Sequence, residues 1–358
     1  MLTRIHRTFV LTGCALTLLL VACGGRSTTA VDDDVVTRRD TIRVPLTQLG
    51  SHTYLGFAGG LYEDGRSSPP EDHAAVGAAR ARNIQPRDAD GAPAAHGKIV
   101  LLSIGMSNAS QEFCGADITS DCVAGSFMQR ASVAPDVNHS SVVLVNGAQG
   151  GMDAREWISP SARTFDVVRD KRLASVGVSE NQVQAVWLLR ATKRPTVSLP
   201  ATDADAFRLE TQLGQIVRAL RIRYPHLQQV HISNRVYGGY ATTSLNPEPY
   251  AYEAGFAVKW LVQAQVSQMR QGGQVVDTRA GDLNYDSTAP WIAWGPDLWA
   301  DGVTPRWDGL TRQRADFKSD GTHPSVESGV PKVGDLLLRF FSTSPVTRCW
   351  FLAGHRCS

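Results

Sequence analysis

A serine followed by an asparagine stands directly after a long apolar run of the sequence. The run is Lys-Ile-Val-Leu-Leu-Ser-Ile at 98–104, and Gly105-Met106-Ser107-Asn108 follows it. A serine at the turn from a buried strand into a helix is exposed at the edge of the sheet, where backbone N–H groups of the helix start point at it. Such a serine is placed to act as a nucleophile, although serine in this position is more often only a helix N-cap. Position 109 is Ala, so the G-x-S-x-G turn of the α/β-hydrolases is absent and that fold is not expected.

A carboxylate and an imidazole near the other end of the sequence are the groups that a nucleophilic serine needs. Ser319-Asp320-Gly321-Thr322-His323-Pro324 precedes the last helical pattern. One ring nitrogen of His323 can take the proton of a serine hydroxyl, while Asp320, three residues earlier across a glycine turn, holds the other nitrogen. Taken alone, this spacing is more often an ordinary loop turn. Together with Ser107 it predicts a catalytic triad of Ser107, His323 and Asp320, with Ser107 and His323 within hydrogen-bonding reach.

Strands and helices that alternate along the chain must bring these groups together. Continuous apolar runs typical of strands buried on both faces occur at 98–104, 141–145, 184–189 and 229–233. Helical spacing of apolar residues occurs from near Asp203 to before Pro225, at 256–269 and at 333–341. This alternation predicts an α/β fold in which helices cover both faces of a mostly parallel sheet, with functional groups at the carboxyl ends of the strands.

The start of the chain has the pattern of an export signal. Arg4 and Arg7 precede an apolar run at 9–20, and Leu20-Val21-Ala22-Cys23 follows. This resembles the lipobox of a bacterial lipoprotein, which implies that residues 1–22 are removed and that Cys23 carries the lipid and anchors the protein in the cell envelope. Gly24 rather than aspartate follows the cysteine, and the resemblance to Gram-negative lipoproteins then implies the outer membrane. A plain secretory signal cut after Ala22 is the alternative.

Three further segments are expected after the signal. Residues 23–40 are small, polar and charged, and we expect a flexible tether there. Residues 41–97 are rich in Gly, Pro and Ala, and we expect an irregular N-terminal extension with one or two edge strands. Residues 98–358 hold the strand and helix patterns and form the predicted catalytic domain.

Composition and charge exclude several classes of protein. With 42% hydrophobic and 20% charged residues, the chain has the composition of a globular protein and not of a disordered one. The predicted signal holds two basic residues and no acidic one, so its removal leaves 34 basic and 34 acidic side chains. A neutral mature chain without a basic run is not expected to bind nucleic acid.

The number and spacing of the cysteines fit an exported protein with disulfide bonds. Once Cys14 has left with the signal and Cys23 is lipidated, four remain, namely Cys114, Cys122, Cys349 and Cys357. Four cysteines allow three connectivities, and sequence separation favours Cys114 with Cys122 and Cys349 with Cys357, both closed in an oxidising compartment. Neither pair has C-x-x-C spacing and no histidine stands at ligand spacing beside the first pair, so no metal site is expected.

The motifs around the predicted triad resemble one family. Gly-x-Ser-Asn at 105–108 and Asp-Gly-x-His-Pro at 320–324 are similar to the SGNH (GDSL-like) hydrolases, which are serine esterases with a flavodoxin-like three-layer α/β/α fold and need no metal or cofactor. The stretch at 145–151 resembles the glycine block of that family, in which a backbone N–H faces the oxyanion. By position this implies Gly151, with Gly150 as the alternative. Residues 150–157 look most like the sialate O-acetylesterase branch, which removes acetyl groups from sugars.

The third block of the family is altered in this chain. The family has Gly-x-Asn-Asp after the next strand, and its Asn side chain is the third oxyanion donor. Here Arg190 stands where the Gly should be and Thr192 where the Asn should be. The threonine hydroxyl can donate one hydrogen bond but is shorter than an amide. The resemblance therefore implies an oxyanion hole made by Ser107, Gly151 and Thr192, or by the two backbone amides alone.

Two classes of function fit these motifs. The first is a surface-anchored serine esterase that removes an acyl group, with acetyl expected, from a small molecule or a carbohydrate. The second is a carbohydrate-binding or envelope-interaction lipoprotein on a catalytically decayed fold, suggested by the altered third block and by four tryptophans expected in a loop. These are Trp291, Trp294, Trp299 and Trp307, for which packing of the loop is the alternative to stacking on sugars. An acyltransferase with the same triad is a smaller third hypothesis.

Overall fold

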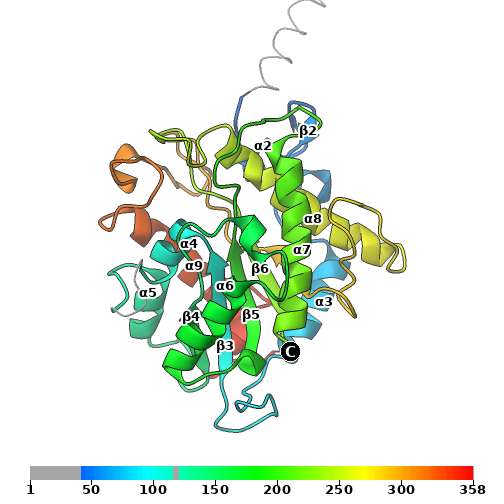
Figure 1. Ribbon diagram of the computed structural model, residues 1–358, viewed down its shortest axis with the longest axis vertical. Coiled ribbons are helices and arrows are strands. Elements are labelled where there is room, and N and C mark those ends of the chain that lie inside the picture. The colour runs from blue at the N-terminus through cyan, green and yellow to red at the C-terminus, as the bar shows by residue number, and fades with distance from the viewer. Residues whose placement is uncertain (1–41, 116–120, 358) are drawn as a thin grey trace, which may run out of the picture. The chain divides into compact units, whose positions relative to one another are not determined.

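A five-stranded parallel sheet lies at the centre of the fold in the computed structural model, which describes residues 42–115 and 121–357 (Figure 1). The strands are β3 (Ile99–Gly105), β4 (Val142–Asn146), β5 (Val183–Leu189), β6 (Gln229–Ser233) and β7 (Trp291–Trp294). Their order across the sheet is β4-β3-β5-β6-β7, and all neighbours are parallel. In chain order this is the 2-1-3-4-5 arrangement of flavodoxin-like folds, so the predicted fold class is confirmed.

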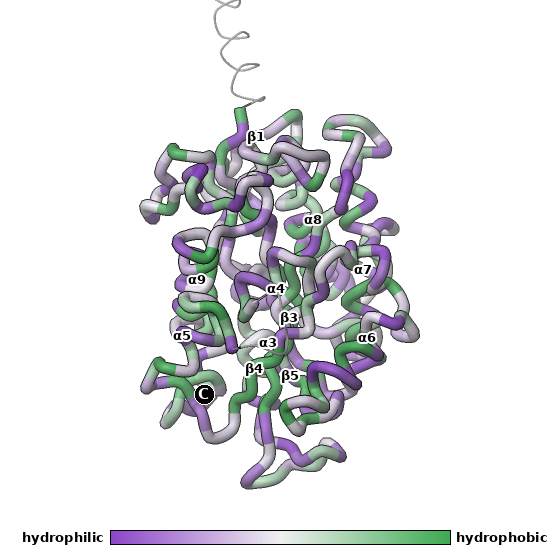
Figure 2. Tube along the Cα trace, turned by 60° about the vertical axis from the view of Figure 1, so that its left-hand side comes forward, coloured by the Kyte–Doolittle hydropathy of each residue, from purple (hydrophilic) through white to green (hydrophobic). Residues whose placement is uncertain are grey.

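Helices cover both faces of the sheet and make two cores. On one face lie α6 (Arg163–Val167), α7 (Asp205–Arg223) and α8 (Tyr250–Arg270), which bury a core with Val100, Leu102 and Ile104 of β3. On the other face lie α3 (Glu71–Arg82), α4 (Ser107–Phe113), α5 (Phe127–Val133), α9 (Gly329–Thr343) and α10 (Arg348–Phe351), packed with Leu101 of β3. Successive residues of β3 therefore enter opposite cores, which explains why this strand is almost continuously apolar in the sequence. The tube is likewise largely green around the labels of β4 and β5 in Figure 2.

Short elements complete the chain. They are α2 (Leu46–Leu49), the antiparallel pair β1 (Thr53–Tyr54) and β2 (Phe57–Ala58), a π-helical segment η3 (Val168–Leu173), and the 3-10 turns η1 (Glu63–Gly65), η2 (Ala154–Trp157), η4 (Ala174–Val176), η5 (Glu180–Gln182) and η6 (Arg314–Asp316). Within the two described ranges, no helix is both long and apolar enough to cross a membrane.

Residues 42–97 are not the irregular extension that the sequence predicted. They contain the 12-residue helix α3, which packs against β6 and β7, and β1 and β2 pair with each other rather than along an edge of the main sheet. The buried residues of α3 are His73, Gly77 and Ala81, which are polar or small and leave no apolar stripe in the sequence. Gly77 lies so close to Trp291 that an added Cβ would be 2.4 Å from the indole ring. The segment belongs to the same compact unit as the rest of the described chain.

The tryptophan-rich stretch is also more regular than expected. Trp291 and Trp294 lie in β7, and Trp299 is buried with its indole N–H donating to Glu248 over 2.8 Å. Only Trp307, which is 71% exposed, remains on the surface among these four. Packing, the alternative to sugar stacking, therefore accounts for three of them.

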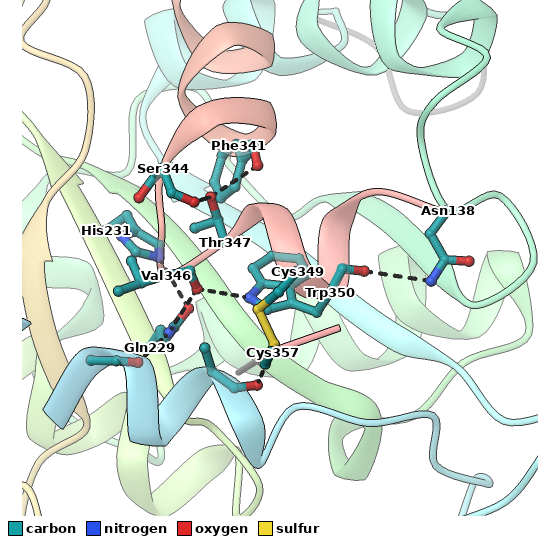
Figure 3. The surroundings of a disulfide bond; sticks show 12 residues. Asn138, Gln229, His231, Phe341, Ser344, Val346, Thr347, Cys349, Trp350 and Cys357 are labelled. Carbon is teal, nitrogen blue, oxygen red and sulfur yellow. Dashed lines mark hydrogen bonds between the residues drawn. A yellow bond between two sulfur atoms is a disulfide. The ribbon is translucent and has the colours of Figure 1, made fainter. Parts of the chain in front are cut away.

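Both predicted disulfides are present. Cys114 joins Cys122 beyond the end of α4, and Cys349 joins Cys357 at the C-terminal end of the fold. Figure 3 shows the second bond beside Trp350, whose carbonyl accepts from Asn138 and whose indole donates to Val346. The predicted signal at 1–22, the lipidation site Cys23 and the tether at 23–40 lie outside the described residues.

Candidate active site

Ser107 begins α4 immediately beyond the carboxyl end of β3. Gly105 closes the strand and Met106, in an extended conformation, precedes the helix. Gly105 is required at this turn, because an added Cβ would lie 2.1 Å from the Cβ of Ala109 and 2.9 Å from the carbonyl of Leu189. The helix thus folds back closely over the strand, and this leaves the Ser107 side chain half-buried at the edge of the sheet.

The three residues of the predicted triad are in contact. The Nε2 atom of His323 lies 2.8 Å from Ser107 Oγ, and its Nδ1 lies 2.5 Å from Asp320 Oδ2. With the proton on Nδ1, the ring donates to Asp320 and leaves Nε2 to accept the Ser107 hydroxyl. The predicted contact between residues 216 positions apart in the sequence is therefore confirmed. In this arrangement a proton can move from Ser107 to His323.

Asp320 is held as an ionised acceptor by three donors. Its Oδ1 accepts the backbone N–H groups of Thr322 (2.9 Å) and His323 (3.0 Å), and its Oδ2 accepts the imidazole. Partial burial by itself would raise the pKa of Asp320, but the hydrogen bonds from the His323 ring and from the two backbone amides outweigh it and lower the pKa to about 2. The carboxylate is therefore charged at neutral pH and orients the imidazole.

The loop that carries Asp320 and His323 is fixed to its surroundings. Gly321 has φ +67°, and an added Cβ would overlap the carbonyl oxygen of Tyr240, so only glycine fits this close approach. The backbone N–H of Thr242 donates to the Asp320 carbonyl over 3.0 Å. These contacts hold the histidine loop against the segment that follows β6.

Asn108, the residue after the nucleophile, links two segments of the site. Its side-chain amide donates to the carbonyl of Thr322 over 3.0 Å, which joins the nucleophile turn to the histidine loop. One helical turn further on, Lys318 Nζ donates to Gln111 over 2.6 Å as a second link. The only signal for this in the sequence is that an Asn follows the Ser in the first motif.

A buried acid, Glu112, lies five residues after the nucleophile on the same helix. Burial raises the pKa of Glu112 to about 7, and the nearby guanidinium groups of Arg235 and Arg312 oppose that shift. No pattern in the sequence indicated this group, because its charged partners come from the segment after β6 and from the loop before α9. Glu112 is thus the one ionisable side chain of α4, and it lies on the buried face of that helix.

The glycine block lies beside Ser107. The backbone N–H of Gln149 donates to the Gly105 carbonyl over 3.0 Å, and an added Cβ on Gly150 would be 3.9 Å from Ser107 Cβ. Gly151, the next residue, has φ +79° and its carbonyl accepts Lys193 Nζ at 3.4 Å. Both glycines proposed for the oxyanion hole therefore lie near the nucleophile, and the choice of Gly151 stays a prediction.

The altered third block is built around a buried arginine. Arg190 Nη1 donates to the carbonyl of Met152 over 2.7 Å, and the guanidinium stacks 4.4 Å from the ring centre of Trp157. Burial holds the pKa of Arg190 well below its usual range. The Arg190 side chain thus fixes the backbone at Met152, directly after the glycine block.

Thr192 ends the same block at the rim of a cavity. Its carbonyl accepts from Asn246 Nδ2 over 3.1 Å, and the residue lines a cavity of about 480 Å³. The direction of its hydroxyl toward the nucleophile stays a prediction.

Comparison with known proteins finds similar solved structures. No family model and no curated protein sequence matches the chain. Similar solved structures include a protein described as a GDSL-like lipase from Parabacteroides merdae (12% identity, 72% of this chain and 97% of the other, TM-score 0.36). A family two carbohydrate esterase from Clostridium thermocellum (14%, 68% and 63%, 0.35) and an extracellular lipase from Streptomyces rimosus (14%, 67% and 99%, 0.27) are also similar.

Proposed function

We propose that this protein is a serine esterase in which Ser107 is the nucleophile. The observation that carries the proposal is the chain of hydrogen bonds from Asp320 through His323 to Ser107. His323 takes the proton as Ser107 Oγ bonds to the ester carbonyl carbon, and gives it to the alcohol as that leaves. Water activated by His323 then releases the acid and regenerates Ser107. The backbone amides of Ser107 and Gly151 stabilise the oxyanion, with Thr192 as a third donor.

The proposed substrate is an acetyl ester on a carbohydrate. The resemblance of residues 150–157 to the sialate O-acetylesterase branch supports an acetylated sugar, and no metal or cofactor takes part in the proposed reaction. The intact contact between Ser107 and His323 is what favours an enzyme over a decayed, purely carbohydrate-binding protein.

A fluorophosphonate probe tests the proposed activity directly, because it reacts only with an activated serine. We expect it to label the mature protein at Ser107, and we expect Ser107→Ala to abolish both labelling and hydrolysis of 4-nitrophenyl acetate. Ser132→Ala is the matched control, since this exposed serine on α5 only donates to the Gln129 carbonyl. A folded protein that is neither labelled nor active would refute the esterase and leave the binding protein as the function.

We also propose that the protein is anchored in the bacterial envelope, in the outer membrane, by a lipid on Cys23. The support is the sequence Leu20-Val21-Ala22-Cys23 behind a short basic and apolar segment. Metabolic labelling with palmitate tests this. Incorporation that is lost in Cys23→Ser is the expected result, and an unlabelled wild-type protein in the soluble fraction is the result that would overturn it.

A further inference from the structure

A cavity of about 480 Å³ adjoins the glycine block on the side of the altered third block. Its walls come from the segment after Gly151, the loop after β5 and the first turns of α7. Its lining residues are Asp153, Arg155, Thr192, Lys193, Arg194, Thr196, Asp205, Arg208 and Gln212. This volume lies in the range found for ligand sites and is large enough for a sugar.

The charges on the cavity wall do not balance. Asp153 pairs with Arg155 at 2.9 Å, and Asp205 pairs with Arg208 at 2.8 Å. Asp205 also accepts the backbone N–H groups of Thr196 (2.6 Å) and Val197 (2.8 Å), so this carboxylate is occupied by structural bonds.

Two cations on the wall remain without a carboxylate. Among residues 42–115 and 121–357, neither Lys193 nor Arg194 has an ion-pair partner, and Lys193 makes only the 3.4 Å contact to Gly151. The four basic and two acidic residues leave the wall with a net charge of +2. Such a wall attracts an anion.

One of the two unpaired cations, Lys193, lies close to the proposed reaction centre. Lys193 Nζ contacts the Gly151 carbonyl, and an added Cβ on the preceding Gly150 would lie 3.9 Å from Ser107 Cβ. A substrate whose ester carbonyl is at Ser107 therefore reaches the cavity by extending past two glycines that have no side chains to block it.

We propose that this cavity is a subsite for a negatively charged group on the alcohol part of the ester, a carboxylate or a phosphate, and that Lys193 and Arg194 bind it. The inference rests on the proposed esterase function and narrows its substrate to anionic saccharide esters. The cavity suits the alcohol part because it is far larger than an acetyl group. The anion displaces Lys193 from its long contact with Gly151 and gains charge-assisted hydrogen bonds.

Three matched acetyl esters test the subsite: mono-O-acetylated methyl glucoside, methyl glucuronide and methyl glucoside 6-phosphate. We expect kcat/KM to be at least about tenfold higher for an anionic ester than for the neutral one. The better of the two anions identifies the group as carboxylate or phosphate. In Lys193→Met we expect the ratio of kcat/KM for the anionic ester to kcat/KM for the neutral ester to fall toward one. The ratio should fall less in Arg194→Met, because the Arg194 side chain is exposed.

Lys98→Met is the matched control. This lysine precedes β3 at the opposite end of the sheet and donates to the Ser140 carbonyl, so its loss leaves the ratio unchanged. Equal kcat/KM for the neutral and anionic esters, or an unaltered preference in Lys193→Met, would overturn the subsite while leaving the esterase intact.

Calorimetry of methyl glucuronide, methyl glucoside 6-phosphate and methyl glucoside binding to Ser107→Ala tests the subsite without turnover. Stronger binding of an anionic glycoside, lost in Ser107→Ala/Lys193→Met, supports it. Equal binding of all three contradicts it, whether or not the wild-type protein hydrolyses esters.

Discussion

Asn108 and Thr322 are joined by a 3.0 Å hydrogen bond from the asparagine amide to the threonine carbonyl, across 214 residues of sequence. The donor follows the nucleophile directly and the acceptor precedes His323 directly. The bond therefore sets the distance between the two reacting side chains, and Asn108 acts as a positioning residue rather than a catalytic one.

Asn108→Ala is expected to lower kcat by roughly 10- to 100-fold with little change in KM, because Ser107 and His323 are no longer held at the distance and orientation that proton transfer needs. Steady-state kinetics on 4-nitrophenyl acetate measures this. Asn108 also lies against buried Glu112, so the free energy of unfolding is measured alongside. Asn181→Ala, which removes a bond to the exposed Ala89 carbonyl, is the control. An unchanged kcat in a folded Asn108→Ala protein would show that the bond positions nothing.

Asp320→Asn is expected to lower kcat by roughly 10²- to 10⁴-fold, because an amide does not select the tautomer in which Nδ1 carries the proton. The same residue affects acid stability. Its pKa is lowered to about 2 in the folded protein, below the ordinary value of 3.8, so its stabilising effect is present above about pH 4 and is lost as the pH falls toward 2.

Denaturant unfolding between pH 6 and pH 2 measures this effect. The difference in unfolding free energy between wild type and Asp320→Asn should shrink across the interval from about pH 4 to pH 2. Ser107→Ala, which keeps the carboxylate, should follow the wild-type curve. A difference that stays constant with pH would contradict the role given to Asp320.

Alanine substitution tests which glycine of the glycine block, Gly150 or Gly151, faces the oxyanion. Gly151 has φ +79°, so Gly151→Ala strains the backbone by about 1–2 kcal/mol and turns the N–H that we assign to the oxyanion. Gly177→Ala is the matched control, because Gly177 has φ +71° with open space around it, away from the lining of the site. Both variants should lose similar stability in thermal unfolding, but only Gly151→Ala should lose kcat. Equal kcat values would transfer the oxyanion role to Gly150.

Sequence patterns predict the parts of this fold that depend on apolar runs. The strand at 99–105 is recognisable because both of its faces are buried, so every residue but one is apolar or glycine. The helix α3 leaves no such pattern because it buries histidine, glycine and alanine, and the four residues of β7, Trp291–Trp294, stand in a Pro- and Gly-rich stretch that is typical of a loop.

The candidate site likewise has residues that the sequence predicts and contacts that it does not. Ser107, Asp320 and His323 are predictable because their residue types and their places at strand and helix ends limit the chemistry. The contacts of Asn108 with Thr322, and of Lys193 with Gly151, are not predictable, since they join segments far apart in the sequence through backbone carbonyls that carry no residue-specific signal.

Thr192 is the last donor to be tested. If its hydroxyl reaches the oxyanion, Thr192→Val should lower kcat for a neutral acetyl ester by up to about 10²-fold with little change in KM, because the lost bond forms mainly in the transition state. Thr192→Asn restores the amide of the family pattern and should raise kcat. Thr196→Val, which removes a hydroxyl from the same cavity wall, is the control. Unchanged kcat in both Thr192 variants would leave the backbone amides of Ser107 and Gly151 as the whole oxyanion hole, with Thr192 serving only to fix the loop after β5 to Asn246.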